Sequence, residues 1–280
     1  MKHAYLIMAH KNLNQLLRLL RALDDARNGI YLHLDSRFRE ADEVDFAGFL
    51  NFSCFHSIPR RTVEWGNYGI VQTEFELLRA AVEEGPYRYY HLLSGQDFPI
   101  KSQSDIHHFF DGQDKEFIHF ADPSGWDRVM QIRLNRFRRP IYQIYLLSEF
   151  LKRRIGIRPM IDFGFGSNWF SITDKFAKDF LAKRRWASRY FINCICPDEL
   201  VLQTFVLTFG YENHLAAAVG TGDETASKRC IDWNRGGDNH PYVWRAADYQ
   251  ILANSSAMFA RKFDTEIDED ILRRIEETLL

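Results

Sequence analysis

Apolar and polar positions form regular blocks along the first part of the chain. A continuous apolar run covers residues 4–8, as expected of a strand buried on both faces. Leucines then recur at helical spacing behind Asn12, which can cap that helix: Leu13, Leu16, Leu17, Leu20 and Leu23. A second apolar run covers residues 30–34. This order of strand, helix and strand predicts a βαβ unit with a parallel sheet.

The alternation continues to the end of the chain. Further strands are predicted at residues 52–58, 89–93, 116–120 and 229–233, and helices at 71–84, 105–110, 175–182, 199–207 and 268–280. Residues 94–99 are expected to form a loop after the strand 89–93. The chain contains no repeat, low-complexity tract or clear linker. We therefore predict an α/β protein in which residues 1–280 form a single domain around a mixed, mostly parallel sheet.

Composition and charge narrow the function classes. With 46% hydrophobic and 15% aromatic residues among 280, the chain can build a substantial core. Lys and Arg number 36 against 38 Asp and Glu, so overall charge gives no argument for a nucleic-acid partner. The four cysteines lack zinc-finger spacing and favour reduced thiols in a reducing compartment. Because no run reaches transmembrane length or resembles a signal peptide, a cytoplasmic protein is expected.

Polar residues follow the ends of the predicted strands. His10 and Asp35 lie just past the first two strands, and Asp97 lies just past the strand 89–93. Ligands of parallel α/β sheets bind beyond these carboxyl ends. Asp35 could therefore hold a ribose or a base edge, and Arg37 could hold a phosphate. Asp35 and Asp97 also suit a simple turn or cap, and the residues alone do not decide between these roles.

The segment Cys196-Pro197-Asp198-Glu199-Leu200 has the character of a helix start. Proline lacks an N–H that the first turn leaves unpaired, and acidic side chains favour the positive end of the helix dipole. Glu199 would then lie on the first turn of the helix 199–207, at the rim of a cleft. A carboxylate there suits a general base that takes a proton from a sugar hydroxyl. A plain helix start explains the same residues equally simply.

Three further segments of the chain have distinctive patterns. Residues 128–158 are strongly basic, which indicates either a solvated face or a surface for an anionic glycan or a membrane-bound, lipid-linked acceptor. The glycines of residues 164–170 do not match the dinucleotide-binding spacing, which argues against a nicotinamide site. Residues 268–270 are the only Asp-x-Asp match, and their place at a helix start suits dipole capping better than metal binding.

Seven short runs occur in one order along almost the whole chain: residues 4–10, 30–37, 64–69, 93–99, 166–170, 197–199 and 259–264. Together they resemble glycosyltransferase family 14, which includes core-2/I-branching N-acetylglucosaminyltransferases and peptide xylosyltransferases, and suggest a bacterial-type member. The most specific runs are SGQDFP at 94–99 and FARKF at 259–263. The resemblance implies a GT-A-like, Rossmann-type nucleotide-sugar-binding sandwich, a UDP-sugar donor and inversion at the anomeric carbon.

The resemblance also implies roles for individual residues. Glu199 would be the catalytic base, and Arg261 and Lys262 would hold the diphosphate together with Arg229. The remaining donor-binding candidates are His10, Asp35, Arg37 and Asp97, and the candidates for the sugar and acceptor pocket are Trp65, Asn168, Trp169 and Trp233. Residues 1–120 would form the nucleotide-binding half, and residues 121–280 would supply the acceptor side, the base and the diphosphate clamp.

The chemistry of inversion fits this assignment. A hydroxyl attacks opposite the departing UDP, so one base on the acceptor side suffices. Arg261 and Lys262 offer adjacent cations for the leaving diphosphate, although an exposed basic pair is the simpler interpretation of two residues. We therefore expect metal-independent transfer of N-acetylglucosamine or xylose from UDP to a glycan or lipid-linked glycan, with no metal or other cofactor. Surface-polysaccharide assembly, with peripheral contact at the inner membrane face through residues 128–158, is the expected setting.

Two other functions remain open at this point. A non-catalytic nucleotide-sugar or glycan-binding module would use Trp65, Trp169 and Trp233 as stacking surfaces and would tolerate loss of Glu199. Another Rossmann-like transferase, such as a methyltransferase, is disfavoured because residues 10–12 (HKN) stand where a glycine-rich loop would follow the first strand.

Overall fold

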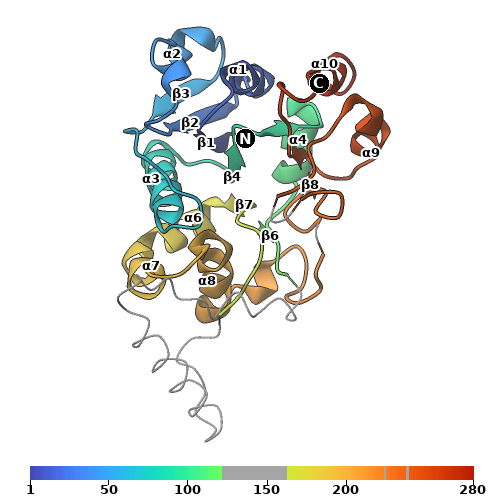
Figure 1. Cartoon of the computed structure of the whole chain (residues 1–280). Coiled ribbons are helices and arrows are strands. Elements are labelled where there is room, and N and C mark those ends of the chain that lie inside the picture. Colours follow the sequence, from blue (N-terminus) through green and yellow to red (C-terminus); the bar gives the residue numbers. More distant parts are fainter. Residues whose placement is uncertain (122–162, 224, 238–239) are drawn as a thin grey trace, which may run out of the picture.

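The computed structural model describes residues 1–121, 163–223, 225–237 and 240–280 (Figure 1). In this part of the chain, the central sheet has the order β3-β2-β1-β4-β7-β6. Its strands are β1 (His3–Ala9), β2 (Asn28–Leu34), β3 (Cys54–Ser57), β4 (Tyr89–Ser94), β6 (Phe117–Ile118) and β7 (Phe170–Thr173). Strands β1 to β4 pair in parallel, whereas β7 runs antiparallel to β4 and β6. The prediction of an α/β fold with a mixed, mostly parallel sheet is confirmed.

A second, three-stranded sheet pairs segments that are far apart in the sequence. It contains β5 (Asp97–Pro99), β9 (Phe259–Arg261) and β8 (Arg229–Ile231), in the order β5-β9-β8. Strand β5 is antiparallel to β9 and places Asp97 opposite Arg261. Residues 97–99 are thus a strand, and the prediction of a loop over the whole of residues 94–99 is wrong at this point. A strand this short depends on a partner more than 160 residues away, which local patterning does not reveal.

Side-chain caps define the starts of two predicted helices. The helices are α1 (Leu13–Ala22), α2 (Phe46–Phe49), α3 (Gly69–Glu84), α4 (Gln103–Asp111), α6 (Asp174–Ala182), α7 (Arg184–Phe191), α8 (Val201–Phe209), α9 (Tyr249–Ala253) and α10 (Asp270–Thr278), with 3₁₀ turns η1 (Arg39–Ala41), η4 (Pro197–Glu199), η5 (Glu212–His214) and η6 (Ala246–Asp248). Asn12 caps α1 by accepting from the Gln15 N–H, and Thr173 caps α6 by accepting from the Phe176 N–H. Across the described residues, no helix combines the length and the apolar character needed to cross a lipid bilayer.

The start of α8 differs from the sequence prediction. Glu199 ends the 3₁₀ turn η4, and the α-helix begins only at Val201. Glu199 therefore precedes the helix and does not lie on its first turn. The 3₁₀ turn, and not the first turn of α8, therefore sets the position of Glu199 in the candidate site described below.

Helices cover both faces of the central sheet (Figure 1). Alternate residues of β1 point to opposite faces, as the pleat of a strand requires. Ala4 and Leu6 belong to a core shared with α3, α6 and α8, whereas Tyr5 and Ile7 belong to a core shared with α1, α4 and α10. The residues of both cores are buried, so β1 and β4 lie in the interior of the protein.

The order of the strands creates a switch point at the carboxyl end of the sheet. The crossover through α1 leads from β1 to β2, whereas the crossover through α3 leads to β4 on the other side of β1. Ligands of open α/β sheets bind where such crossovers diverge. The segment after β9 lies over this point, because Lys11 and Asn12 bind the Asp264 carboxylate at 2.7 and 2.9 Å. The fold thereby brings residues 259–264 to the ends of β1 and β4.

Candidate active site

Charged side chains gather around His10 at the carboxyl end of β1. His10 is exposed, and its pKa is lowered from the usual value, first by partial loss of hydration and then by repulsion from Lys11. Arg261 and Lys262 lower this pKa as well, whereas Asp35 raises it. Groups that act on one imidazole in this way must lie near it. The structure therefore brings together four residues that the sequence assigned to donor binding.

Asp35 and Arg37 hold each other at the end of β2. Arg37 donates from Nε and from a terminal nitrogen to the two oxygens of the Asp35 carboxylate, both at 2.8 Å. The Val63 N–H donates to the same carboxylate at 2.9 Å. These donors hold the pKa of Asp35 well below its usual range. The two side chains bind one another in this structure, and their direct contact with a nucleotide donor stays a prediction.

Arg261 is fixed from three directions. Its guanidinium donates to Asp97 Oδ1 at 2.7 Å and to the Ser94 hydroxyl at 2.5 Å. The guanidinium carbon also lies 4.4 Å from the centre of the Trp169 ring, within cation–π distance. Asp97 and Trp169 are both buried. These two residues were predicted to contact the donor or the acceptor, and the structure instead places them as supports for Arg261.

Lys262 follows as a second cation that is half buried. Its carbonyl accepts from the Trp244 N–H at 2.9 Å, while the Trp244 indole N–H donates to the Arg261 carbonyl at 2.8 Å. Burial lowers the pKa of the Lys262 ammonium, and repulsion from Arg261 and Lys11 lowers it further. Closely spaced cations of this kind attract an anion, so this part of the site suits a diphosphate.

Arg229 lies beneath the site and not in it. Its side chain is 1% exposed, and it donates to the carbonyls of Leu92, Phe170 and Ser227 and to the Ser171 hydroxyl. Burial lowers the pKa of this guanidinium to about 9. The prediction that Arg229 helps to hold the diphosphate is corrected, because the side chain is buried and its two terminal nitrogens are used to join β4, β7 and the segment before β8. Sequence alone gives no signal that distinguishes a buried arginine from a ligand-binding one.

Glu199 lies between two loops that the sequence singled out. The Cys196 N–H donates to the Gly66 carbonyl at 3.1 Å, and the Gly166 N–H donates to the Glu199 carbonyl at 3.0 Å. The second contact requires glycine, since a Cβ on Gly166 would lie 2.0 Å from the His119 carbonyl oxygen. We call residues 164–169 the glycine segment. In this segment, the Gly166 N–H contacts the Glu199 turn, and the ring of Trp169 packs against the guanidinium of Arg261.

The predicted sugar and acceptor residues are divided by the fold. Trp65 is 69% exposed in the loop that touches the Glu199 turn, and Trp233 is 44% exposed after β8. Trp169 is covered by Arg261, and Asn168 lies near the buried Glu74, whose pKa it lowers. Of these four predicted residues, Trp65 and Trp233 are the two that present open aromatic surfaces. The basic segment 128–158, predicted to face an acceptor or a membrane, lies outside the described residues.

Two acids near Glu199, the buried Glu74 and the half-buried Asp198, were not among the predicted site residues. Glu74 is buried on α3, and its pKa is raised well above the usual value by burial and by the Asp198 carboxylate. Burial also raises the pKa of Asp198 to about 6. A neutral Glu74 is the expected result, because a second desolvated charge beside Asp198 would be repelled. Glu74 could have been noticed, since it occupies the same helical stripe as the apolar Val71 and Leu78.

Residues 268–270 act as a helix cap, as the sequence suggested. Asp268 Oδ1 accepts from the Ile271 N–H at 3.0 Å, and its Oδ2 accepts from the Ala246 N–H at 3.0 Å. Glu269 pairs with Arg18, and Asp270 pairs with Arg273. The three carboxylates are thus engaged in different contacts around the start of α10 and do not converge on one point.

Comparison with known proteins gives one consistent family. A family model described as Core-2/I-Branching enzyme matches residues 3–254. Beta-glucuronosyltransferase GlcAT14B of Arabidopsis thaliana is 24% identical over 294 residues, which cover 99% of this chain and 66% of that protein. N-acetyllactosaminide beta-1,6-N-acetylglucosaminyl-transferase of Mus musculus is 24% identical over 292 residues, which cover 93% of this chain and 68% of that protein.

Among solved structures, mouse xyloside xylosyltransferase 1 in its apo form aligns with a TM-score of 0.41 at 13% identity, covering 92% of this chain and 96% of that one. The chain thus spans about two thirds of the length of the two curated relatives above, at 66% and 68%.

Proposed function

The chain belongs to the Core-2/I-branching enzyme family, and from this premise we propose that it is an inverting, GT-A-like glycosyltransferase that moves a sugar from UDP to a glycan hydroxyl. Glu199 is the proposed general base. Arg261 and Lys262 are the proposed partners of the departing diphosphate. The sugar would lie between these groups, close to the glycine segment that connects them.

The glycine segment is the observation that carries the proposal. Its Gly166 N–H binds the carbonyl of Glu199 at 3.0 Å, and three residues later Trp169 lies 4.4 Å from the Arg261 guanidinium carbon. A base and a cation attached to one short segment can flank a single sugar ring. An in-line displacement needs this arrangement, because the base acts on the side of the incoming hydroxyl and the cations act on the side of the leaving group.

The proposed step conserves charge and atoms. The acceptor oxygen forms a bond to the anomeric carbon as the bond from that carbon to the UDP oxygen breaks. The hydroxyl proton passes to the Glu199 carboxylate, and the bonding electron pair leaves with UDP. General-base help of this kind contributes about 10²–10⁴-fold to the rate. Fixed cations at Arg261 and Lys262 would stabilise the charge that develops on the diphosphate.

We further propose that the transfer step uses these cations in place of a divalent metal. Support comes from the grouping of Lys11, Arg261 and Lys262: burial, and then repulsion from Arg261 and Lys11, lower the pKa of Lys262. Lys11 is paired with Asp264 and Arg261 with Asp97, but a diphosphate would still relieve the repulsion at Lys262.

For the donor sugar and the acceptor, we propose chemical classes and not single compounds. The relatives named above are called glucuronosyl and N-acetylglucosaminyl transferases, and we propose N-acetylglucosamine or xylose as the sugar and a glycan or lipid-linked glycan as the acceptor. Surface-polysaccharide assembly in the cytoplasm is the proposed setting. A thermal-shift screen of UDP-sugars would identify the donor, because binding to the folded state raises its stability by mass action.

Replacement of Glu199 tests the central claim. The Glu199→Gln variant keeps the size and hydrogen-bonding capacity of the side chain but cannot take a proton. We expect UDP release in the presence of acceptor to fall by about 10²–10⁴-fold, with little change in donor affinity. Glu212→Gln, at an exposed position of η5, is the matched control and should keep full activity.

Two results would contradict the proposal. If Glu199→Gln turns over within a few-fold of the parent protein, Glu199 is not the base. If the parent protein binds a UDP-sugar yet releases no UDP with any acceptor of a broad glycan panel, the non-catalytic binding module is the better description.

A further inference from the structure

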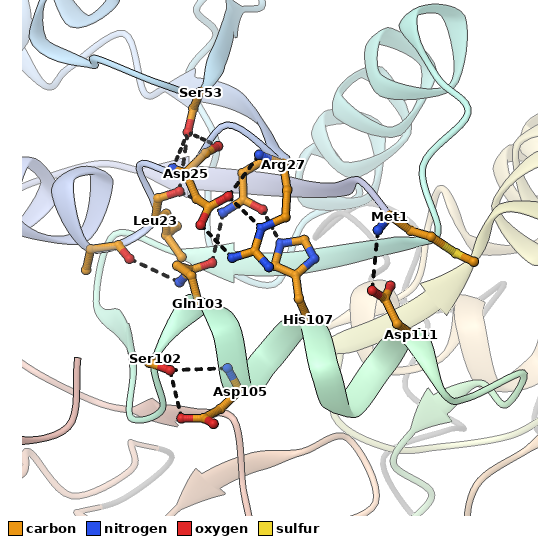
Figure 2. Close-up of polar contacts among 12 residues, drawn as sticks. Met1, Leu23, Asp25, Arg27, Ser53, Ser102, Gln103, Asp105, His107 and Asp111 are labelled. Atoms are coloured by element: carbon orange, nitrogen blue, oxygen red, sulfur yellow. Dashed lines mark hydrogen bonds and ion pairs between the residues drawn. The ribbon is translucent and has the colours of Figure 1, made fainter.

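A second polar cluster lies at the amino end of β1, and the candidate active site lies at the carboxyl end of the same strand. His3 begins β1, whereas His10 follows its carboxyl end. His107 and Asp111 lie one turn apart on α4, and Figure 2 shows both side chains on the side of the helix that faces the start of the chain. One potential ligand atom from each of His3, His107 and Asp111 lies within 4.8 Å of the other two.

Three buried polar atoms in this cluster lack a hydrogen-bond partner among the described residues. They are Nε2 of His3, Nδ1 of His107 and Oδ1 of Asp111. His3 is 0% exposed and His107 is 1% exposed. The His3 Nε2 and Asp111 Oδ1 atoms lie 3.5 Å apart, which is long for a hydrogen bond. Buried polar atoms are nearly always satisfied, so three together need an explanation.

The surrounding hydrogen bonds determine which nitrogen of His107 is available. Asn28 donates from Nδ2 to the Leu23 carbonyl and to Gln103, which fixes its amide orientation. Its Oδ1 therefore accepts, and it lies 2.8 Å from His107 Nε2. His107 must carry its proton on Nε2, which leaves a lone pair on Nδ1 directed into the cluster.

A similar chain supports His3. Its Nδ1 lies 3.2 Å from Nε2 of His91, and Nδ1 of His91 lies 2.7 Å from the Ser171 hydroxyl oxygen. That oxygen also accepts from Arg229 at 2.7 Å. If both histidines donate along the chain toward Ser171, its oxygen accepts from His91 and Arg229, and His3 keeps a lone pair on Nε2. Metal-bound histidines are typically oriented by such outer hydrogen bonds.

We propose that His3, His107 and Asp111 bind a late first-row divalent cation, zinc above all, in a structural site that joins α4 to the start of β1. Two imidazole nitrogens and a carboxylate oxygen form a ligand set that zinc accepts, with water in a further position. The ligand atoms must draw together, because tetrahedral zinc places its ligands roughly 3.3 Å apart. Asp111 is partly exposed at the end of α4 and has the freedom to make this movement.

The imidazole rings of His3 and His107 lie face to face in the structure. The rings stack with centroids 4.0 Å apart and 22° between their planes, so they must open slightly around a shared ion.

The second oxygen of Asp111 has a different partner. Asp111 Oδ2 lies 3.3 Å from the amino group of Met1, as the dashed line in Figure 2 shows. Binding experiments should therefore use protein with its own first residue and without a histidine tag. The inference does not depend on the proposed function, because none of the three ligands belongs to the candidate active site.

Calorimetric titration of chelator-treated protein with zinc chloride tests the site. We expect one ion per chain and a rise of about 5 °C or more in the unfolding midpoint at saturation. Asp111→Asn and His107→Gln should each weaken binding by at least about 100-fold, the upper range for loss of even an outer partner. Asp114→Asn and His108→Ala alter exposed residues on or next to α4 and should bind as the parent protein does.

X-ray absorption of the zinc-loaded parent protein gives a second readout that needs no variant. Scattering from two imidazole rings is expected at about 2.0–2.1 Å. The inference is overturned if zinc does not bind with one-to-one stoichiometry, if bound zinc shows no imidazole scattering, or if folded Asp111→Asn and His107→Gln both bind as tightly as the two control variants.

Discussion

The Arg261 guanidinium carbon lies 4.4 Å from the centre of the Trp169 ring, and the same guanidinium binds the buried Asp97 carboxylate at 2.7 Å. Trp169 immediately precedes β7 and Asp97 begins β5, so the arginine is held where the central sheet meets the second sheet. A guanidinium fixed in this way loses little freedom when it binds an anion. Its position is therefore a property of the fold and not of a flexible surface side chain.

Replacement of Arg261 by lysine should separate charge from geometry. An ammonium can pair with Asp97 or with a phosphate, but it cannot also reproduce the planar contact with Trp169. We expect Arg261→Lys to lower kcat/KM for the UDP-sugar by about 10²–10³-fold while the protein stays folded. Steady-state kinetics measure the effect, and Arg273→Lys on the exposed side of α10 is the control. Activity within a few-fold of the parent protein would exclude Arg261 from the diphosphate site.

Lys262 gives an independent test of the proposed clamp. Its side chain is half buried and its ammonium is repelled by Arg261, so removal of its charge should cost little stability. Lys262→Met should lower kcat by about 10-fold or more, because one cation near the leaving group is lost. The control is Lys178→Met, which removes an exposed ion pair with Asp174. A lowered unfolding midpoint with unchanged kcat would instead indicate a structural role for Lys262.

His10 should report the arrival of the diphosphate. Partial loss of hydration, and then the neighbouring cations Lys11, Arg261 and Lys262, lower the pKa of His10 in the free protein, and a bound anion should raise it. Binding then takes up a proton, so the affinity for a UDP-sugar should increase as the pH falls from about 7.5 to about 5.5. A diphosphate diester is the right probe, because it keeps a constant charge over this range.

The matching control for this linkage is His10→Gln, in which the dependence on pH should become weaker. Nuclear magnetic resonance can follow the His10 ring directly with and without donor. An unchanged or lowered pKa in the complex would place the diphosphate elsewhere.

Arg229 should prove structural. Arg229→Met fills a similar volume but leaves the carbonyls of Leu92, Phe170 and Ser227 without their donor. Since buried acceptors that lose a charged partner are costly, we expect a loss of about 3–5 kcal/mol in the free energy of unfolding, measured in urea. The exposed Arg273→Met serves as the comparison. A stable Arg229→Met protein with weakened donor binding would restore the role first predicted from sequence.

The regular parts of the fold were predictable because local pattern and tertiary role agree. The apolar runs at residues 4–8 and 30–34 became the buried strands β1 and β2, and Asn12 and Thr173 cap the helices that follow them. Strand β5 and the 3₁₀ turn at Glu199 were not predictable in the same way. Their geometry is set by partners far away in the chain, Phe259–Arg261 for the first and Gly66 and Gly166 for the second.

In the candidate site, too, some features could be predicted from the sequence and others could not. Placing His10 and Asp35 at strand ends followed from the rules of parallel sheets. Whether a polar residue faces a ligand or another side chain depends on packing, as Asp97 and Arg229 demonstrate. The proposed zinc ligands escaped notice because His3 and His107 are separated by more than a hundred residues, so no short spacing connects them.

A chelator should affect stability and transfer differently. If zinc binds at His3, His107 and Asp111 while transfer relies on Arg261 and Lys262, EDTA should lower the unfolding midpoint of the parent protein but leave its initial rate unchanged at a temperature well below that midpoint. In Asp111→Asn, neither quantity should respond to EDTA, because the ion is already absent. Restoration of a lost rate by manganese in both proteins would contradict metal-independent transfer. A loss of the initial rate that occurs in the parent protein alone and is reversed by zinc would have a different meaning. It would show that the proposed zinc site at the amino end of β1 supports catalysis through the hydrogen-bonded chain from His3 to Arg229.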